Sequence, residues 1–391
     1  MGKKTAVIVA IKNWSFGFPH IIASDFLSGF RAAGISAFYA PLAKVPGFYK
    51  DIEEDHHIAF TLLMNFTHES AKLPWGGKVL TWQQDNPYVM LDRVYSRYPD
   101  QHWLCADRDG VENAAFYFGA QHPAMHLPHW ATRFDADVGA QTESRSRWEE
   151  HRPLDFVFIG SIREEEVEKT RRSIDGLSEP LRTFSHRLLE GIYSRPRDTV
   201  STIAFDLERE MGIELSKRRF DVFRRILLQV DFLVRALNRL ELFKRLRGLR
   251  IAVVSNDTAT VEKYVGPVTK LSPSDFLTGL VAMKQAKLIL NNLPIYRYGA
   301  TERLFNAQYR GAAVLSERNA FLEERFGEGQ GIFLYDPENL DGIKDRIAAI
   351  LADRQALFEV AREGHRRTCA EHTIDNRVQS ILRAHAAEAV Q

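Results

Sequence analysis

The chain has 391 residues, of which 45% are hydrophobic and 26% charged, and it carries 52 Lys plus Arg against 51 Asp plus Glu. This composition is typical of a soluble globular protein with enough residues for two domains, and the balanced charge gives no reason to expect a nucleic-acid binder. Two distant cysteines, Cys105 and Cys369, exclude a disulfide framework and a cysteine zinc site, so we expect thiols in a reducing cytoplasm.

The start of the chain leads directly into a strand and shows no signal-peptide pattern, and no run approaches the roughly 20 apolar residues of a membrane span. We therefore expect a cytoplasmic protein. The arginine-rich stretch Lys217–Arg250 could contact acidic lipid at the inner face of a membrane. A solvated helical face is the simpler interpretation.

The first third of the chain alternates strands with helices. The apolar run Lys4–Ile11 predicts a strand, Ile21–Ala33 a helix that ends at Gly34, and Ile35–Tyr39 a second strand. This order is typical of a βαβ unit with a parallel sheet, without the glycine fingerprint of dinucleotide binding. Further strands are predicted at Ile58–Phe66, Lys78–Gln83 and Trp103–Ala106, and a helix near Gly110–Phe118.

A second α/β unit begins at the strand Leu154–Ile159, after a polar stretch that we interpret as a linker over residues 136–153. A helical insertion follows at about residues 164–247, and its apolar stripe includes Val230, Leu233 and Leu237. Strands are then predicted at Leu249–Val254, Leu288–Asn291 and Ile332–Tyr335, and helices at Ser274–Ala286, Asn339–Ala352, Arg354–Arg366 and Asp375–Ala387.

The most informative segment is residues 298–326, which predicts a loop, a helix, a glycine stop and a short apolar strand. Thr301 stands where an N-cap belongs, Gly311 where a left-handed residue ends the helix, and Ala312–Leu315 supplies the strand. The order places a helix N-terminus beside Arg297 and Arg303. An anion such as a nucleotide diphosphate fits such a place.

Two βαβ units joined by a polar linker predict an α/β protein of two Rossmann-like domains that face each other across a cleft. We expect the domains to cover residues 1–135 and 154–370, with a last helix at 371–391 that could cross back to the first domain. In such folds ligands bind outside the carboxyl ends of the strands.

Several motifs, in order, resemble the GT-B glycosyltransferases of the group-1 type, and in particular their CgeB-like (spore maturation protein) branch. They include FVFIGS at 156–161, LRIAVVSND, KLILNN, ERLFNAQYRGAAVLSE and YDPENL; WQQDNPYVMLDR and MHLPHWAT resemble the amino-terminal domain of that branch more weakly. Each motif is loose by itself, and their order and spacing carry the resemblance.

The resemblance implies transfer of a sugar from a nucleotide-sugar donor on the C-terminal domain to an acceptor on the N-terminal domain, with no bound metal. The glutamate that commonly contacts the nucleotide ribose falls on Asn306, and its partner acid falls on Tyr298. Asn306 can still bond a hydroxyl. Glu302 is the alternative ribose ligand, or an acid that favours a helix N-terminus.

For the donor, Arg303 and Arg297 are candidates for the diphosphate, against a solvated helix or loop arginine. The other candidates are loop residues at strand ends, each with a turn or cap as the alternative: Gly160, Ser161, Asn256 and Asp257.

For the acceptor, Asn13, Trp14 and Gly17 lie in a loop after the first strand, where aromatic rings could stack on a sugar. Asp85 is a candidate base for an acceptor hydroxyl, as an inverting reaction needs, with a turn cap as the alternative. His20 is a further candidate base, and so is Asp25. His129 is a candidate cleft residue.

The function that we infer from the sequence is a metal-independent glycosyltransferase of bacterial glycan synthesis, with a nucleotide sugar as donor and a glycan or glycoconjugate as acceptor. A catalytically silent nucleotide- or glycan-binding protein and a nucleotide-sugar epimerase are the alternatives.

Overall fold

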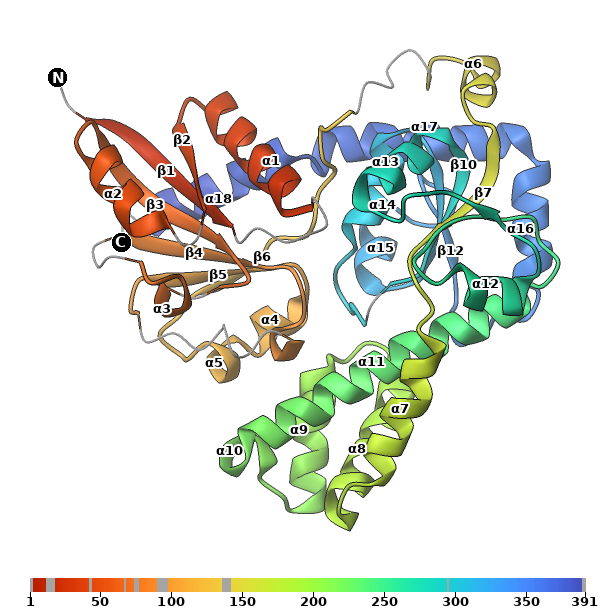
Figure 1. Ribbon diagram of the computed structural model, residues 1–391, viewed down its shortest axis with the longest axis horizontal. Coiled ribbons are helices and arrows are strands. Elements are labelled where there is room, and N and C mark those ends of the chain that lie inside the picture. The colour runs from red at the N-terminus through yellow and green to blue at the C-terminus, as the bar shows by residue number, and fades with distance from the viewer. Residues whose placement is uncertain are drawn as a thin grey trace. The chain divides into compact units, whose positions relative to one another are not determined.

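The computed structural model describes residues 3–11, 18–41, 44–66, 68–73, 77–89, 98–135, 142–293 and 295–388. Its chain forms two compact units, one of Met1–Ala136 with Cys369–Gln391 and one of Asp137–Thr368 (Figure 1). Asn13, Trp14 and Gly17 lie outside the described residues.

The first unit is built on a parallel sheet whose six described strands run in the order β2-β1-β3-β4-β5-β6. The strands are β1 (Lys4–Ile11), β2 (Ser36–Pro41), β3 (His56–Met64), β4 (Lys78–Gln83), β5 (Gln101–Cys105) and β6 (Ala124–His126). Around them lie α1 (Phe18–Ala32), α2 (Val45–Glu53), α3 (His68–Ala71), the 3₁₀ turn η2 (Pro87–Val89), α4 (Arg108–Glu112), α5 (Ala114–Tyr117) and α18 (Ile374–Glu388).

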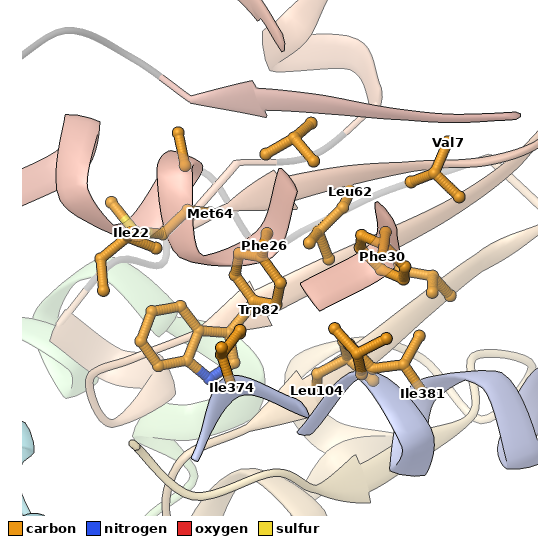
Figure 2. Close-up of a cluster of buried hydrophobic side chains, with 14 of the residues drawn as sticks. Val7, Ile22, Phe26, Phe30, Leu62, Met64, Trp82, Leu104, Ile374 and Ile381 are labelled. Carbon is orange, nitrogen blue, oxygen red and sulfur yellow. The ribbon is translucent and has the colours of Figure 1, made fainter. Parts of the chain in front are cut away.

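Both faces of this sheet are buried, which is why β1 is apolar from Ala6 to Ile11. Val7 and Val9 point into one core cluster, whereas Ala6 and Ile8 point into the other. Such continuous apolar strands are typical of parallel sheets covered on both sides. Figure 2 shows the first cluster, in which strand residues such as Trp82 meet side chains of α1 and α18.

Helix α18 is tied to the first unit by Arg377. This buried guanidinium donates from Nε to the carbonyl of Pro128 at 2.8 Å and from Nη2 to that of His129 at 2.8 Å. Helix α18 also packs closely on α1, where Gly29 leaves no room for a β-carbon, which would lie 2.9 Å from Val378 Cγ2. The last helix of the chain is therefore part of the core of the first unit.

We expect Arg377→Met to destabilise the first unit by about 2 kcal/mol, because charge-assisted hydrogen bonds to buried carbonyls would be lost. Urea unfolding followed by circular dichroism measures the loss. Arg383→Met is the matched control, since Arg383 is exposed on the same helix. Equal stability of the two variants would contradict the role given to Arg377.

The second unit holds another parallel sheet of six described strands, in the order β12-β11-β10-β7-β8-β9. Its strands are β7 (Leu154–Ile159), β8 (Ala252–Val254), β9 (Thr269–Lys270), β10 (Ala286–Asn291), β11 (Ala313–Glu317) and β12 (Phe333–Tyr335). Besides the helices of the predicted insertion, its helices are α6 (Arg145–Glu150), α12 (Thr258–Val265), α13 (Phe276–Gln285), α14 (Glu302–Tyr309), α15 (Ala320–Arg325), α16 (Ile343–Ala352) and α17 (Arg354–Glu371).

The predicted insertion between β7 and β8 is a bundle of helices (Figure 1). It consists of α7 (Glu164–Asp175), α8 (Glu179–Ser194), α9 (Val200–Met211), α10 (Leu215–Arg218) and α11 (Phe220–Arg245). Many of its arginines pair with acids, for example Arg218 with Glu214 at 2.7 Å and Arg245 with Glu241 at 3.1 Å. These pairs favour the solvated-face interpretation of the arginine-rich stretch.

The predicted α/β fold with two parallel, Rossmann-like sheets is confirmed. Part of the stretch expected to be a linker is nevertheless structured, because α6 and the turn after it carry two residues that are buried in the second unit. Trp148 donates from Nε1 to the carbonyl of Gly311 at 2.7 Å, and Arg152 is fully buried. The helix predicted near Gly110–Phe118 is two short helices, α4 and α5.

Candidate functional site

The second sheet has a topological switch point between β7 and β10. The chain proceeds from β7 outward to β8 and β9, and then returns to place β10 on the other side of β7. In parallel α/β sheets, ligands bind beyond the carboxyl ends of the strands at such a point, because the flanking loops diverge there. The residues that follow these two strands, Gly160 and Asn292, therefore mark the expected binding edge.

Arg239 of α11 crosses this switch point. Its Nη1 donates to the carbonyl of Ser161 at 2.9 Å, and its Nε donates to Asn292 Oδ1 at 2.8 Å. Burial, together with the nearby Arg303 and Arg235, lowers the pKa of Arg239 to about 9. The insertion thus places a cation, still charged at neutral pH, at the binding edge of the sheet.

Arg303 lies in the first turn of α14, as the sequence predicts. Among the described residues it has no hydrogen-bond partner for its buried Nη1 atom. Burial lowers the pKa of Arg303, and Glu302 opposes that shift. The hydroxyl of Thr301, the N-cap residue, donates to Asn291 Oδ1 at 3.1 Å, and no side-chain bond caps the helix. The amide groups of this first turn and Arg303 form a place suited to an anion.

Arg297 and Glu317 complete the charged cluster. Arg297 donates from Nη2 to the carbonyl of Ile192 in α8 at 2.6 Å. Glu317, at the end of β11, accepts from Asn292 Nδ2 at 2.7 Å. Burial raises the pKa of Glu317 to about 7, although Arg297 and Arg239 favour its charged form. Three arginines accompany one carboxylate, so this cluster has a net positive charge that favours an anionic ligand.

A cavity of about 280 Å³ opens beside Glu317 and Arg297. One wall comes from the insertion, through Tyr193, Arg197 and Val234. The opposite wall is formed by the loop after β10 and by the segment after β11. The helical insertion therefore shapes a pocket at the edge of the sheet where ligands are expected.

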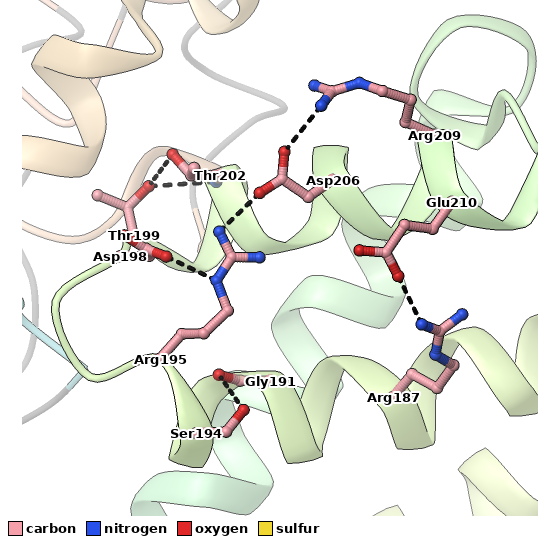
Figure 3. Close-up of polar contacts among 10 residues, drawn as sticks. All are labelled: Arg187, Gly191, Ser194, Arg195, Asp198, Thr199, Thr202, Asp206, Arg209 and Glu210. Atoms are coloured by element: carbon pink, nitrogen blue, oxygen red, sulfur yellow. Dashed lines mark hydrogen bonds and ion pairs between the residues drawn. The ribbon is translucent and has the colours of Figure 1, made fainter.

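The corner between α8 and α9, which carries Arg197, is fixed by a charged cluster (Figure 3). Arg195 donates from Nε to Asp198 and from Nη2 to Asp206, both at 2.6 Å. Arg209 reaches the other oxygen of Asp206 at 3.3 Å. Because Arg195 bridges two carboxylates, it holds the connection that forms part of the cavity wall.

We expect Arg195→Met to cost about 1 kcal/mol, because a charged network contributes more than an isolated surface pair. It should also speed hydrogen exchange of the amides at 195–206, as mass spectrometry can measure. Arg209→Met is the control, with a single, more exposed ion pair. Unchanged exchange in the Arg195 variant would refute this positioning role.

The donor residues predicted from the sequence are not all brought together. Gly160 lies at the switch point with a φ of +148°, which favours glycine, and the carbonyl of Ser161 faces Arg239. Asp257 caps α12 by accepting from the amide of Thr260 at 3.2 Å, and Asn256 is exposed. Capping is the alternative that the sequence had left open for this pair.

The residues at the positions of the family's acid pair are engaged in other contacts. Asn306 is buried, and its Oδ1 accepts from Arg310 Nη1 at 3.1 Å. The hydroxyl of Tyr298 donates to Glu324. Glu302 is partly exposed at the start of α14. Ribose binding by Asn306 or by Glu302 stays a prediction.

On the first unit, the candidate bases differ in their surroundings. Asp85 is partly exposed just after β4, and the nearby His129 is buried, with its Nε2 3.4 Å from the carbonyl of Gln84. His20 is exposed in the first turn of α1. Asp25 accepts from Trp130 Nε1 at 3.1 Å and from Thr132 Oγ1 at 3.0 Å, which is a structural role.

The sequence reasoning missed Arg239, Asn292 and Glu317. Asn292 and Glu317 follow directly after apolar strands, so the rule that ligands bind beyond strand ends could have found them. Arg239 lies within an amphipathic helix, where its sequence neighbours give no sign that it reaches the sheet. Within the described ranges, no group of His, Cys, Asp or Glu side chains is arranged as a metal site, and no helix is long and apolar enough to cross a membrane.

Residues 231–383 match the family described as glycosyl transferase-like, Glyco_trans_1_2. This part of the chain is similar to the group-1 glycosyltransferases. The matched segment contains Arg239, Arg297, Arg303 and Glu317, so the charged cluster lies within the residues that resemble this family. No curated protein is similar enough to count as a relative.

A solved glycosyltransferase structure shares the architecture. An alpha-glucosyltransferase in complex with UDP and a 13-mer DNA aligns with a TM-score of 0.52 and 10% identity over 95% of this chain and 96% of that one. AviGT4, a glycosyltransferase involved in avilamycin A biosynthesis, gives 0.49 and 12% over 97% of each chain. WaaG, of lipopolysaccharide biosynthesis, gives 0.48 and 10% over 96% and 98%. The fold is that of the GT-B glycosyltransferases.

Proposed function

We propose that the carboxyl edge of the second sheet binds the diphosphate of a nucleotide-sugar donor, and that the chain transfers the sugar to a glycan or glycoconjugate acceptor. The observation that carries the proposal is the position of Arg239 across the switch point, with Arg303 near enough to lower its pKa. Oriented guanidinium groups bind phosphate oxygens strongly. One structure that shares the fold was solved with UDP, which agrees with a nucleotide donor.

The proposed reaction needs no metal, since the arginines and the first turn of α14 can stabilise the departing diphosphate. Asp85 is the proposed base for the acceptor hydroxyl, because it follows a strand of the first sheet at the edge where ligands are expected. The resemblance to the CgeB-like branch supports the same assignment of donor and acceptor domains.

Binding and turnover test this function together. UDP, GDP and ADP, each alone and as the glucose conjugate, would be titrated by calorimetry in the presence of EDTA, and release of the diphosphate would be followed. We expect one nucleotide to bind, to raise the Tm and to be released from its sugar conjugate. Absence of binding by all of them would overturn the proposal.

A catalytically silent nucleotide-binding protein is the second candidate. It is favoured because Asn306 and Tyr298, which have no carboxylate, stand at the two positions where the family commonly has acids. Both side chains are engaged in other contacts. Nucleotide binding without turnover, across sugar conjugates and acceptors, would support it. Product formation that is lost in an Arg303 variant would exclude it, and conversion of a donor incubated alone into an epimer would identify an epimerase.

A further inference from the structure

Glu317 presents a free carboxylate oxygen to the cavity. Its Oε2 accepts two hydrogen bonds, from Asn292 Nδ2 at 2.7 Å and from the amide of Leu293 at 3.2 Å. Both hydrogen bonds described for this carboxylate are made through Oε2, and the side chain lines the cavity. One oxygen therefore fixes the carboxylate, and the other remains available as an acceptor.

The position of Glu317 is unfavourable for the protein without a ligand. Burial raises the pKa of this carboxyl to about 7, so that the partial compensation from Arg297, Arg239 and Asn292 does not offset the loss of water. A glutamine of the same shape could keep the bonds to Asn292 and Leu293 without that cost. A half-buried acid kept under these conditions indicates a role in binding rather than in stability.

The surroundings of the free oxygen fit the hydroxyl groups of a sugar ring. The carboxylate needs a donor, and the cavity walls offer Tyr193 and Tyr296 as faces for an apolar or ring-shaped group, with Asn238 as a further polar contact. Arg297 lines the same cavity, and Arg239 lies at the switch point. A ring next to a bound diphosphate would thus come within reach of Glu317.

We propose that Glu317 binds the hydroxyl groups of a sugar ring attached to the diphosphate of the bound donor, and that the helical insertion closes the other side of this subsite. The inference rests on the proposed donor function. The ring is either the ribose of the nucleotide or the transferred sugar, and the two sources are distinguished by the ligands used in the test.

The test compares the intact chain with Glu317→Gln and with Glu359→Gln, an exposed control on α17. Each protein is titrated with the tightest binder among UDP, GDP and ADP, with its 2′-deoxy analogue and with its glucose conjugate. We expect Glu317→Gln to weaken binding about tenfold, the difference between a charged and a neutral acceptor. The control should bind as the wild type does.

The pattern across the three ligands identifies the ring. Loss with the ribonucleotide but not with its 2′-deoxy analogue assigns Glu317 to the ribose. Loss with the glucose conjugate alone assigns it to the transferred sugar. Equal affinity of Glu317→Gln and wild type for all three ligands would overturn this inference, whereas failure of the wild type to bind any of them would overturn the donor function.

Stability gives a readout that a purely structural role would not produce. The pKa of Glu317 is raised from 4.5 to about 7 by folding, so its contribution to stability falls as the pH rises through that window and stays low above it. We expect Glu317→Gln to have a higher Tm than the wild type at pH 8, and the difference to shrink as the pH falls towards 4.5. A lower Tm of the variant at pH 8 would show a structural role and overturn the inference.

Discussion

Replacing Arg152 with methionine is expected to destabilise the second unit by about 3–5 kcal/mol, the cost of removing one partner from a buried charged network. The guanidinium is fully buried and donates from Nη1 to the carbonyls of Lys284 at 2.7 Å and Ala286 at 3.0 Å, and from Nη2 to that of Arg310. These carbonyls lie at or just beyond the ends of α13 and α14. The last carbonyls of a helix have no partner within it, and a cation at that end also meets the negative end of the helix dipole.

Burial lowers the pKa of Arg152 to about 9, so the side chain is still a cation at neutral pH. Methionine has a similar length but no donor, and would leave the carbonyls buried without partners. Arg152→Lys should lose less, because one ammonium group can satisfy only part of the set. The measurement is chemical unfolding monitored by circular dichroism, with Arg145→Met on the exposed side of α6 as control. A loss below about 1 kcal/mol in Arg152→Met would contradict this account, since that is the size of an ordinary hydrogen bond.

The strands of both sheets could be predicted because their apolar runs end in polar or glycine residues. Lys4–Ile11, Lys78–Gln83 and Leu154–Ile159 were predicted with the bounds that the structure has. The strand pattern did not reveal the two residues that fix the expected linker to the second unit, Trp148 and Arg152. Arg152 stands in a polar stretch, and only the tertiary structure shows that its partners are carbonyls more than a hundred residues further along the chain.

The candidate site was predictable in part for a similar reason. Arg303 could be located because the helix N-terminus and the strand after it are both local patterns. Arg239 could not, because its function depends on how a long helix of the insertion packs on the sheet. Asn306 shows a third case: its position was predicted, but the bond to Arg310 depends on which face of α14 is buried.

Arg239 and Arg303 also differ in what they contribute to the protein without a ligand. Arg239 holds the two strand ends of the switch point together through Ser161 and Asn292. Arg303 makes no hydrogen bond among the described residues and is close enough to another cation to shift its pKa. A change at Arg239 would therefore mix structural and binding effects, whereas a change at Arg303 reports on binding.

Arg303→Met is accordingly expected to weaken binding of the nucleoside diphosphate by about 30- to 150-fold. This corresponds to about 2–3 kcal/mol, the contribution of a charge-assisted hydrogen bond to a phosphate group. The unfolding midpoint should be unchanged or slightly higher, because a partly buried cation that makes no hydrogen bond among the described residues is removed. Calorimetric titration of the wild type and the variant measures the affinity, and thermal unfolding without nucleotide measures the stability.

Arg225→Met is the matched control, because Arg225 is an exposed arginine on α11 and the same charge is lost from the chain. If binding depended only on the overall charge, the two variants would lose affinity equally, and the loss would diminish with added salt. A contact of Arg303 with the phosphate predicts a loss confined to the Arg303 variant and largely retained at high salt. Equal affinities of the Arg303 variant and the wild type would remove Arg303 from the donor site and leave Arg239 and Arg297 to hold the diphosphate.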